Sequence, residues 1–174
     1  MEDTRESPNR LLCQTYVQIQ DMLDSLRRIS PHVTVVQGHM DDIRTYERFE
    51  VVEIGDFKVG VCHGRCLMVG EIDQHDEAAV AMVQRKIGAD ILVMGDSSKG
   101  FLAYQRPDDG GIVVCPGSAT GWSRNSMVGG GRPSFALMDI KGNKVVVYSY
   151  VLNVENELEV DKVEFTNNNY KSHN

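Results

Sequence analysis

Apolar and polar positions along the chain change their spacing several times, and each change predicts a different element. Between residues 16 and 29 apolar side chains recur every three or four positions, which predicts an amphipathic helix that ends before Pro31. The same spacing over Asp76–Ile87 predicts a second helix, and Gly88 is well placed to end it. Short apolar runs bounded by Gly, Pro and Asn predict strands in the rest of the chain.

The predicted strands comprise two buried strands, three hairpins and one edge strand. Continuous apolar runs at residues 33–36 and 91–94 are typical of strands buried on both faces. Alternating apolar and polar residues over 158–165 predict the edge strand. The predicted hairpins join residues 50–54 to 58–62, 101–104 to 111–114, and 135–140 to 144–152.

This distribution of elements predicts one layered α/β (α+β) domain with two packed sheets, because helices cluster in the first half and strands dominate the second. A chain of 174 residues fits a single domain with a substantial core. We expect residues 1–10, which are polar and contain Pro8, to be a disordered lead, residues 11–166 to form the domain, and residues 167–174 to be a loose tail.

Charge and cysteine content narrow the function classes. A net charge of −7 argues against general affinity for nucleic acids or anionic membranes, which both require basic surfaces. No apolar run approaches the roughly 18 residues that a membrane span needs, and the N-terminus is too polar for a signal peptide. The 4 cysteines form no Cys-x-x-Cys motif, which favours reduced thiols in a cytosolic protein over a zinc ribbon.

Three predicted strands end in glycine-containing motifs: Gly38-His-Met-Asp41, His63-Gly-Arg65 and Gly95-Asp-Ser-Ser98. A fourth, the loop Pro116-Gly-Ser-Ala-Thr-Gly121, follows the apolar run that ends at Cys115. In this order the motifs resemble the calcineurin-like metallophosphoesterase family over about residues 11–165. The resemblance implies a four-layer α/β/β/α sandwich. The family opens with a strand that carries metal ligands, and no residues before Leu11 match it.

The resemblance also implies where metal ligands would lie. A two-metal phosphoesterase needs several His, Asp and Asn ligands on convergent loops. Here Arg65 replaces a family histidine, and its fixed charge would repel a metal. We therefore expect no catalytic residue and no enzymatic activity. At most one weakly bound Zn or Mn ion is expected, at His39, His63 and Asp96, and the alternative is a structural, hydrogen-bonded His63. The degenerate ligand positions are His39, Asp41, His63, Asp96 and Ser98.

A phosphoesterase body that has lost its ligands can still bind other proteins. Within the family the chain is most similar to a non-catalytic branch, the small subunits of retromer. This resemblance implies a scaffold that binds a large helical-solenoid subunit in endosome-to-Golgi or plasma-membrane transport, cytoplasmic and peripheral on endosomes through its partners. Leu67 and Met68 fall at the positions that contact the large subunit, and internal loop packing is the alternative for them.

A second contact surface is predicted on the strand at residues 144–152. Tyr148, Tyr150 and Leu152 alternate, so they share one face of that strand. In the family a hydrophobic patch in this region receives regulatory proteins, although these side chains could instead cover a helix or the other sheet. The alternative function is a metal-dependent phosphodiesterase or phosphatase.

Overall fold

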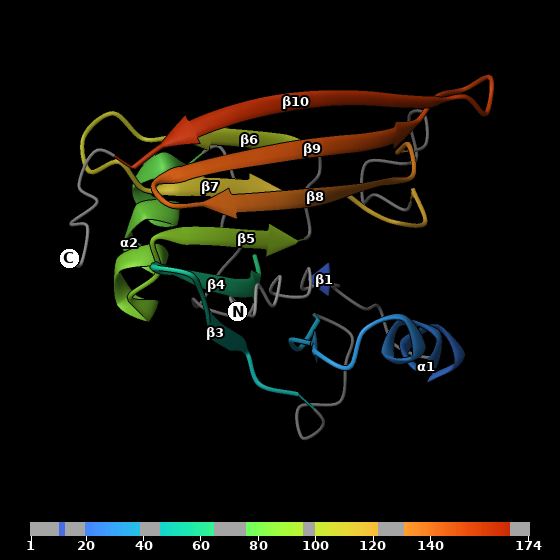
Figure 1. Ribbon diagram of the computed structural model, residues 1–174, viewed down its shortest axis with the longest axis horizontal. Helices are drawn as coiled ribbons and strands as arrows, with labels where there is room; N and C mark the ends of the chain where they lie inside the picture. The colour runs from blue at the N-terminus through green and yellow to red at the C-terminus, as the bar shows by residue number, and fades with distance from the viewer. Residues whose placement is uncertain are drawn as a thin grey trace, which may run out of the picture.

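The computed structural model describes residues 11–12, 20–38, 46–64, 76–95, 100–121 and 131–167. Within these ranges the chain forms two helices and three sheets (Figure 1). Neither of the two helices is long and apolar enough to cross a membrane. The architecture is the mixed α/β fold that the order of elements predicts.

A five-stranded sheet forms the centre of the domain. Its three middle strands are parallel, and each of its two edge strands pairs antiparallel with its neighbour. The two predicted hairpins of this sheet, 50–54 with 58–62 and 101–104 with 111–114, are both present. In spatial order the strands are β3 (Phe49–Ile54), β4 (Phe57–His63), β5 (Ile91–Gly95), β7 (Ile112–Cys115) and β6 (Leu102–Gln105).

Helix α2 (Glu77–Ile87) covers one face of this sheet. Its start is capped by the Asp76 carboxylate, which accepts a hydrogen bond from the Ala79 amide at 3.1 Å. Gly88 ends it with a left-handed φ of 68°, as the sequence predicts. Val80 and Val83 of the helix pack on the strands in a buried cluster with Cys62, Leu92, Met94, Val113 and Cys115.

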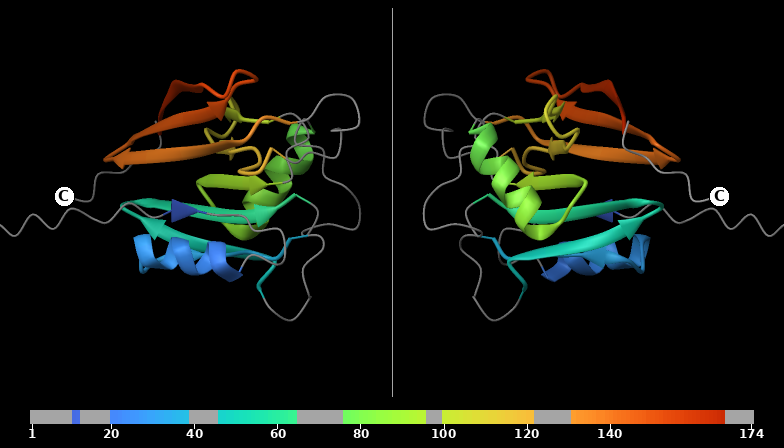
Figure 2. Two further views of the ribbon diagram at one scale, coloured as in Figure 1. Left: turned by 90° about the vertical axis from the view of Figure 1, so that its right-hand side faces the viewer. Right: turned by 90° about the vertical axis from the view of Figure 1, so that its left-hand side faces the viewer.

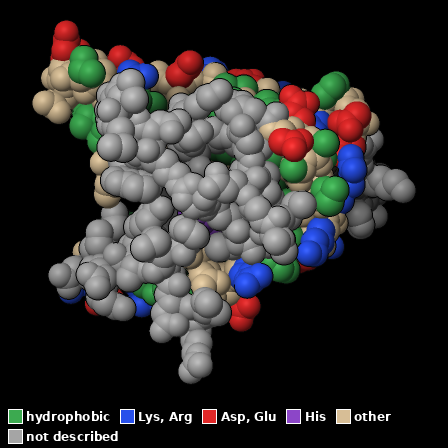
Figure 3. All heavy atoms as spheres, turned by 180° about the vertical axis from the view of Figure 1, so that it is seen from behind, with side chains coloured by type: hydrophobic (Ala, Val, Ile, Leu, Met, Phe, Trp, Pro, Cys, Tyr) green, Lys and Arg blue, Asp and Glu red, His purple; other side chains and the backbone are tan. Residues whose placement is uncertain are grey.

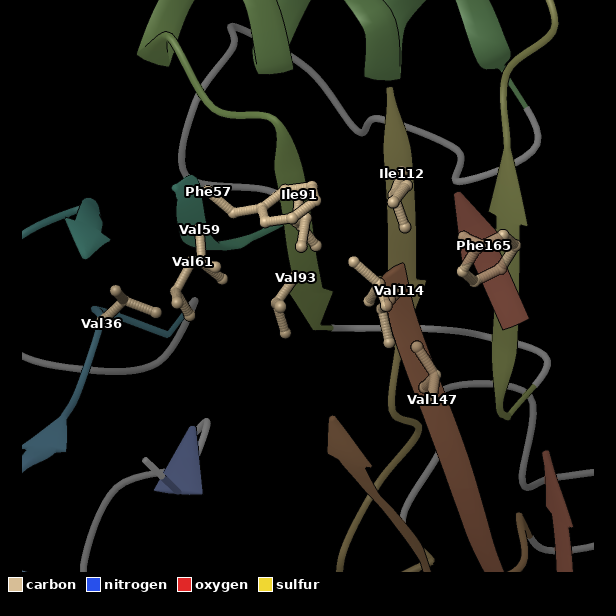
Figure 4. Close-up of a cluster of buried hydrophobic side chains, with 11 residues drawn as sticks. Val36, Phe57, Val59, Val61, Ile91, Val93, Ile112, Val114, Val147 and Phe165 are labelled. Carbon is tan, nitrogen blue, oxygen red and sulfur yellow. The ribbon is translucent and has the colours of Figure 1, made fainter. Parts of the chain in front are cut away.

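The other face of the five-stranded sheet packs against an antiparallel three-stranded sheet. This sheet consists of β8 (Ser134–Lys141), β9 (Lys144–Leu152) and β10 (Leu158–Thr166), in the order β10-β9-β8. β10 is an edge strand, as its alternating pattern predicts. Figure 4 shows how the side chains of the two sheets meet in the main core, which includes Val59, Val61, Ile91, Val93, Ile112, Val114, Val147 and Phe165.

The first part of the chain differs in detail from the prediction. Helix α1 (Gln20–Ile29) is described from residue 20 onward, and its Ile29 is exposed although it falls on the predicted apolar face. Of the strand predicted over 33–36, the described residues form β2 (Val33–Thr34), which pairs in parallel with β1 (Leu11–Leu12). Figures 1 and 2 show α1 beside β1 and β2, away from α2.

Candidate metal centre and partner surface

β4 and β5 are adjacent parallel strands of the five-stranded sheet, so their carboxyl ends lie side by side. His63, the last residue of β4, is in register with Gly95, the last residue of β5. The amide of Gly64 donates a hydrogen bond to the Gly95 carbonyl at 3.4 Å. In open α/β sheets ligands bind outside the carboxyl ends of the strands. The structure therefore brings two of the predicted motifs together at the position where such a site forms.

His63 is the one predicted ligand that the structure describes, and its side chain is only 1% exposed. A buried histidine is compatible with both interpretations, the metal ligand and the structural residue. His39, Asp41, Asp96 and Ser98 lie outside the described residues, and so does Arg65. In the ranges that the structure describes, no group of three or more His, Cys, Asp and Glu side chains could hold a metal ion. The metal site stays a prediction.

Cys62 near the end of β4 and Cys115 at the end of β7 are buried, and neither forms a disulfide. Burial raises the pKa of Cys115 to about 12. The Cys115 thiol is therefore protonated at neutral pH, and a protonated thiol is neither a good nucleophile nor a metal ligand. It acts as a small apolar side chain in the core, as the sequence predicts.

The loop Pro116–Gly121 connects the two main sheets at this end of the domain. Its Ser118 carbonyl accepts a hydrogen bond from the Ser134 amide at 2.8 Å, and the Ser134 hydroxyl donates to the Pro116 carbonyl at 3.0 Å. Gly117 has a φ of 81°, and a Cβ there would overlap the Ser134 hydroxyl. The loop thus packs tightly on the start of β8.

The three-stranded sheet carries an apolar surface on the side away from the core. On β9, Val145 and Val147 are buried against the other sheet, so the alternating Tyr148 and Tyr150 point outward and are half-buried. The ladder places Tyr150 between Phe135 and Val160, and Tyr148 between Leu137 and Lys162. We call this surface the outer-sheet patch; it consists of Phe135, Leu137, Tyr148, Tyr150, Leu152, Leu158 and Val160.

Phe135 is the most informative addition to the three residues predicted from the sequence. Its ring stacks on Tyr150 with a centroid distance of 4.7 Å and an interplanar angle of 1°, yet 44% of Phe135 remains exposed. Val160, on the other side of Tyr150, is 54% exposed. The predicted turn Lys141-Gly142-Asn143 fixes the register of β8 and β9 and was the signal that could have identified Phe135 and Leu137.

The second predicted contact, Leu67 and Met68, lies outside the described residues. The surface seen from behind in Figure 3 carries both signs of charge among the described residues, with Asp and Glu interspersed with Lys and Arg. The apolar side chains coloured there are scattered. The outer-sheet patch is therefore the best-defined candidate for partner binding in the described part of the chain.

Comparison with known proteins identifies the family. Residues 11–165 match the model of the calcineurin-like phosphoesterase superfamily domain. The vacuolar protein sorting-associated protein 29 of Schizosaccharomyces pombe is 28% identical over 160 residues, which cover 90% of this chain and 81% of that protein.

Two solved structures show the same fold. The Entamoeba histolytica Vps29 crystal structure with Zn is 30% identical with a TM-score of 0.76, covering 91% of this chain and 83% of that one. Chaetomium thermophilum Vps29 in complex with a cyclic peptide is 26% identical with a TM-score of 0.72, covering 91% of this chain and 80% of that one. The chain thus belongs to the calcineurin-like phosphoesterase superfamily and, within it, to the Vps29 family.

Proposed function

We propose that this chain is a non-catalytic scaffold subunit of a retromer-type protein-sorting complex. Its relationship to vacuolar protein sorting-associated protein 29 supports this assignment. The observation that carries the binding role is the outer-sheet patch, in which exposed Phe135 and half-buried Tyr150 stand on a rigid sheet. Aromatic side chains that are fixed in place and only partly covered are preferred anchors of protein interfaces.

The protein would bind two kinds of partner through two separate surfaces. Leu67 and Met68, which follow the carboxyl end of β4 in the sequence, bind the large helical-solenoid subunit of retromer. The outer-sheet patch binds regulatory proteins, and the peptide complex of the Chaetomium relative supports peptide binding within the family. Through these partners the protein is cytoplasmic and peripheral on endosomal membranes, where it serves transport to the Golgi and the plasma membrane.

The second candidate is a metal-dependent phosphodiesterase. The superfamily and the zinc complex of the Entamoeba relative favour it. In our proposal Arg65, Asp96 and Ser98 in the ligand motifs prevent a dinuclear site, so the chain holds at most one weakly bound Zn or Mn ion.

The scaffold role is tested by a pair of variants with opposite expectations. The chain is co-expressed with the large retromer subunit of the same organism, and the complex is purified by a tag on that subunit. We expect Met68→Asp to abolish co-purification and Tyr150→Asp to leave it intact, because the two positions serve different partners. Full binding by a folded Met68→Asp protein would remove Leu67 and Met68 from the interface.

The enzyme alternative is tested with the purified chain in Mn²⁺ or Zn²⁺ and a generic phosphodiester, bis-p-nitrophenyl phosphate. We expect no turnover above that of the metal alone. Saturable hydrolysis that disappears in a His63→Ala variant with unchanged circular dichroism would overturn the scaffold assignment in favour of catalysis.

A further inference from the structure

The β9–β10 hairpin extends past the end of β8. Ser134, the first residue of β8, is in register with Val151, and the Leu152 amide reaches back to the Pro133 carbonyl at 2.9 Å. Beyond this point no further strand of the described residues pairs with the hairpin, which ends in a turn at residues 153–157. Figure 1 shows this hairpin end projecting from the rest of the sheet.

The turn at the hairpin end is held in one conformation by Asn153. Its side-chain carbonyl oxygen accepts hydrogen bonds from the Glu155 amide at 2.9 Å and the Glu157 amide at 2.8 Å. The Asn153 amide also donates to the Glu157 carbonyl at 2.9 Å, and Asn156 adopts a left-handed φ of 60°. A partner that contacts this turn would therefore pay little conformational entropy for ordering it.

Apolar side chains continue from the outer-sheet patch to this end. Leu152 and Leu158 face each other across the hairpin on the patch side, and Val154 in the turn is 90% exposed. A single exposed valine is unremarkable on a surface. The cross-strand pair of Leu152 and Leu158 carries the apolar surface from Phe135 and Tyr150 along the hairpin to the turn that contains Val154.

Charge distinguishes the two ends of that surface. At the end remote from the turn, Lys162 pairs with Glu164 at 2.9 Å and Lys141 with Asp139 at 3.0 Å, and the exposed Lys144 adds one positive charge. Glu155 and Glu157 in the turn are exposed, and neither forms an ion pair with another described residue. The surface is therefore nearly neutral at one end and negative at the other.

We propose that the outer-sheet patch binds a peptide segment of a partner protein that has apolar residues over the Phe135–Tyr150 stack and Lys or Arg residues directed at the hairpin end. This inference rests on the proposed function for the patch as a docking surface and adds the chemistry and direction of its ligand. Apolar burial provides the affinity, and the acidic end sets the orientation and accelerates association.

Exposed charge pairs contribute modestly and are screened by salt. Reversing one acidic residue at the hairpin end is therefore expected to weaken binding of a basic-flanked peptide about 3- to 10-fold at low salt and less than about 2-fold at high salt. The apolar contacts are expected to be insensitive to salt.

The experiment selects ligands from a random peptide display library on the purified full chain and measures the selected peptides by fluorescence anisotropy at about 0.05 and 0.5 M NaCl. We expect selected peptides to carry Lys or Arg on one side of an apolar core and to lose binding to Tyr150→Asp. Glu157→Lys should weaken them at low salt, whereas Asp161→Lys should not; Asp161 carries the same charge but pairs with inward-facing Ser149.

The outcomes distinguish the docking surface from the basic flank of its ligand. Peptides that require Tyr150 but show no basic flank, or no difference between Glu157→Lys and Asp161→Lys, would overturn this inference and leave the docking surface standing. Peptides that bind Tyr150→Asp as well as the unchanged chain would overturn the docking surface itself, and this inference with it.

Discussion

Asp109→Asn should destabilise the protein far more than the same change at its neighbour Asp108. The reason is Arg106, whose guanidinium is only 4% exposed. Its Nε and Nη2 donate to the two carboxylate oxygens of Asp109, both at 2.9 Å. Its Nη1 donates to Gln84 Oε1 at 2.7 Å. Removing the Asp109 charge leaves this buried cation with only the exposed Asp108, 3.8 Å away, as a counter-ion.

The network ties α2 to the β6–β7 turn. Gln84, in the last turns of α2, also donates from Nε2 to the Asp90 carbonyl at 2.7 Å. Gly111 follows the turn, and a Cβ at that position would overlap the Arg106 guanidinium. The glycine therefore leaves the space that the buried arginine occupies. Loss of the hydrogen bonds between Arg106 and Asp109 is therefore expected to destabilise both the end of α2 and the β6–β7 turn.

The magnitude follows from the pKa. The hydrogen bonds from the Arg106 side chain, together with the Gly111 amide and the Arg85 side chain, lower the pKa of Asp109 from 3.8 to about 2. Without solvent screening, a shift of this size corresponds to roughly 2.5 kcal/mol in the free energy of unfolding. Because 32% of the Asp109 side chain is exposed, solvent screening reduces this to about 1–2 kcal/mol. The buried Arg106, left with the exposed Asp108 as its counter-ion, adds to it, so we expect a loss of about 2–3 kcal/mol for Asp109→Asn.

The pH dependence has a definite sign. Since the folded pKa of Asp109 is lower than the unfolded one, its contribution is complete above about pH 5 and disappears as the pH falls through about 2. The stability difference between the unchanged chain and Asp109→Asn should therefore narrow over this interval.

Urea denaturation followed by circular dichroism, repeated from pH 7 downward, measures this difference in the free energy of unfolding. At neutral pH the Asp109→Asn substitution should lower Tm by about 4–12 °C. Asp108→Asn is the matched control: Asp108 is 62% exposed and lies 3.8 Å from Arg106 Nε, so it should change stability by at most about 0.5 kcal/mol. Equal effects of the two substitutions, or a difference independent of pH, would refute the role assigned to the buried pair.

Three further predictions concern single side chains. Gly117→Ala should lower the free energy of unfolding by more than about 2 kcal/mol, because the alanine would combine a positive φ with an overlap with Ser134. Gly142→Ala, which has a positive φ but open space around it, should lower it by about 1 kcal/mol. Equal shifts in Tm for the two variants would contradict this. Tyr104→Phe should leave Tm unchanged or raise it, since the buried Tyr104 hydroxyl has no hydrogen-bond partner among the described residues, and a clear loss of stability would show that the hydroxyl is paired. Cys115 should resist alkylation by iodoacetamide in the folded protein at pH 8, measured by mass spectrometry against the urea-unfolded chain; rapid native modification would argue against its burial.

Local patterns in the sequence predicted most of the regular structure. Helix α2 was identified by its spacing and by Gly88, and the hairpin of β8 and β9 by the turn at Lys141-Gly142-Asn143. These signals lie within one element or within one turn. The strand predicted over 33–36 is regular at Val33–Thr34, and its pairing with β1, which is distant in the sequence, is not encoded in the local pattern.

The outer-sheet patch could be predicted only in part, because its residues come from more than one strand. Tyr148 and Tyr150 alternate on one strand, so the sequence places them on a common face. Phe135 joins them through the register of a neighbouring strand, and Arg106 is buried although it precedes Pro107-Asp-Asp-Gly110, a pattern typical of an exposed turn. The turn at Lys141-Gly142-Asn143 could have placed Phe135 beside Tyr150, whereas the burial of Arg106 depends on tertiary packing, which residue spacing does not encode.

The two edges of the three-stranded sheet show how packing and function are linked in this domain. β10 carries Glu159, Asp161, Lys162 and Glu164, and charges on an edge strand oppose pairing with other chains. β8 lacks such a run: its inward Ala136 and Met138 contribute to the core and its outward Phe135 and Leu137 to the patch. Of the described residues only β9 pairs with β8. The residues that stabilise the sheet and those of the outer-sheet patch therefore alternate along β8, so substitutions that test the proposed binding without unfolding the chain must be confined to its outward positions.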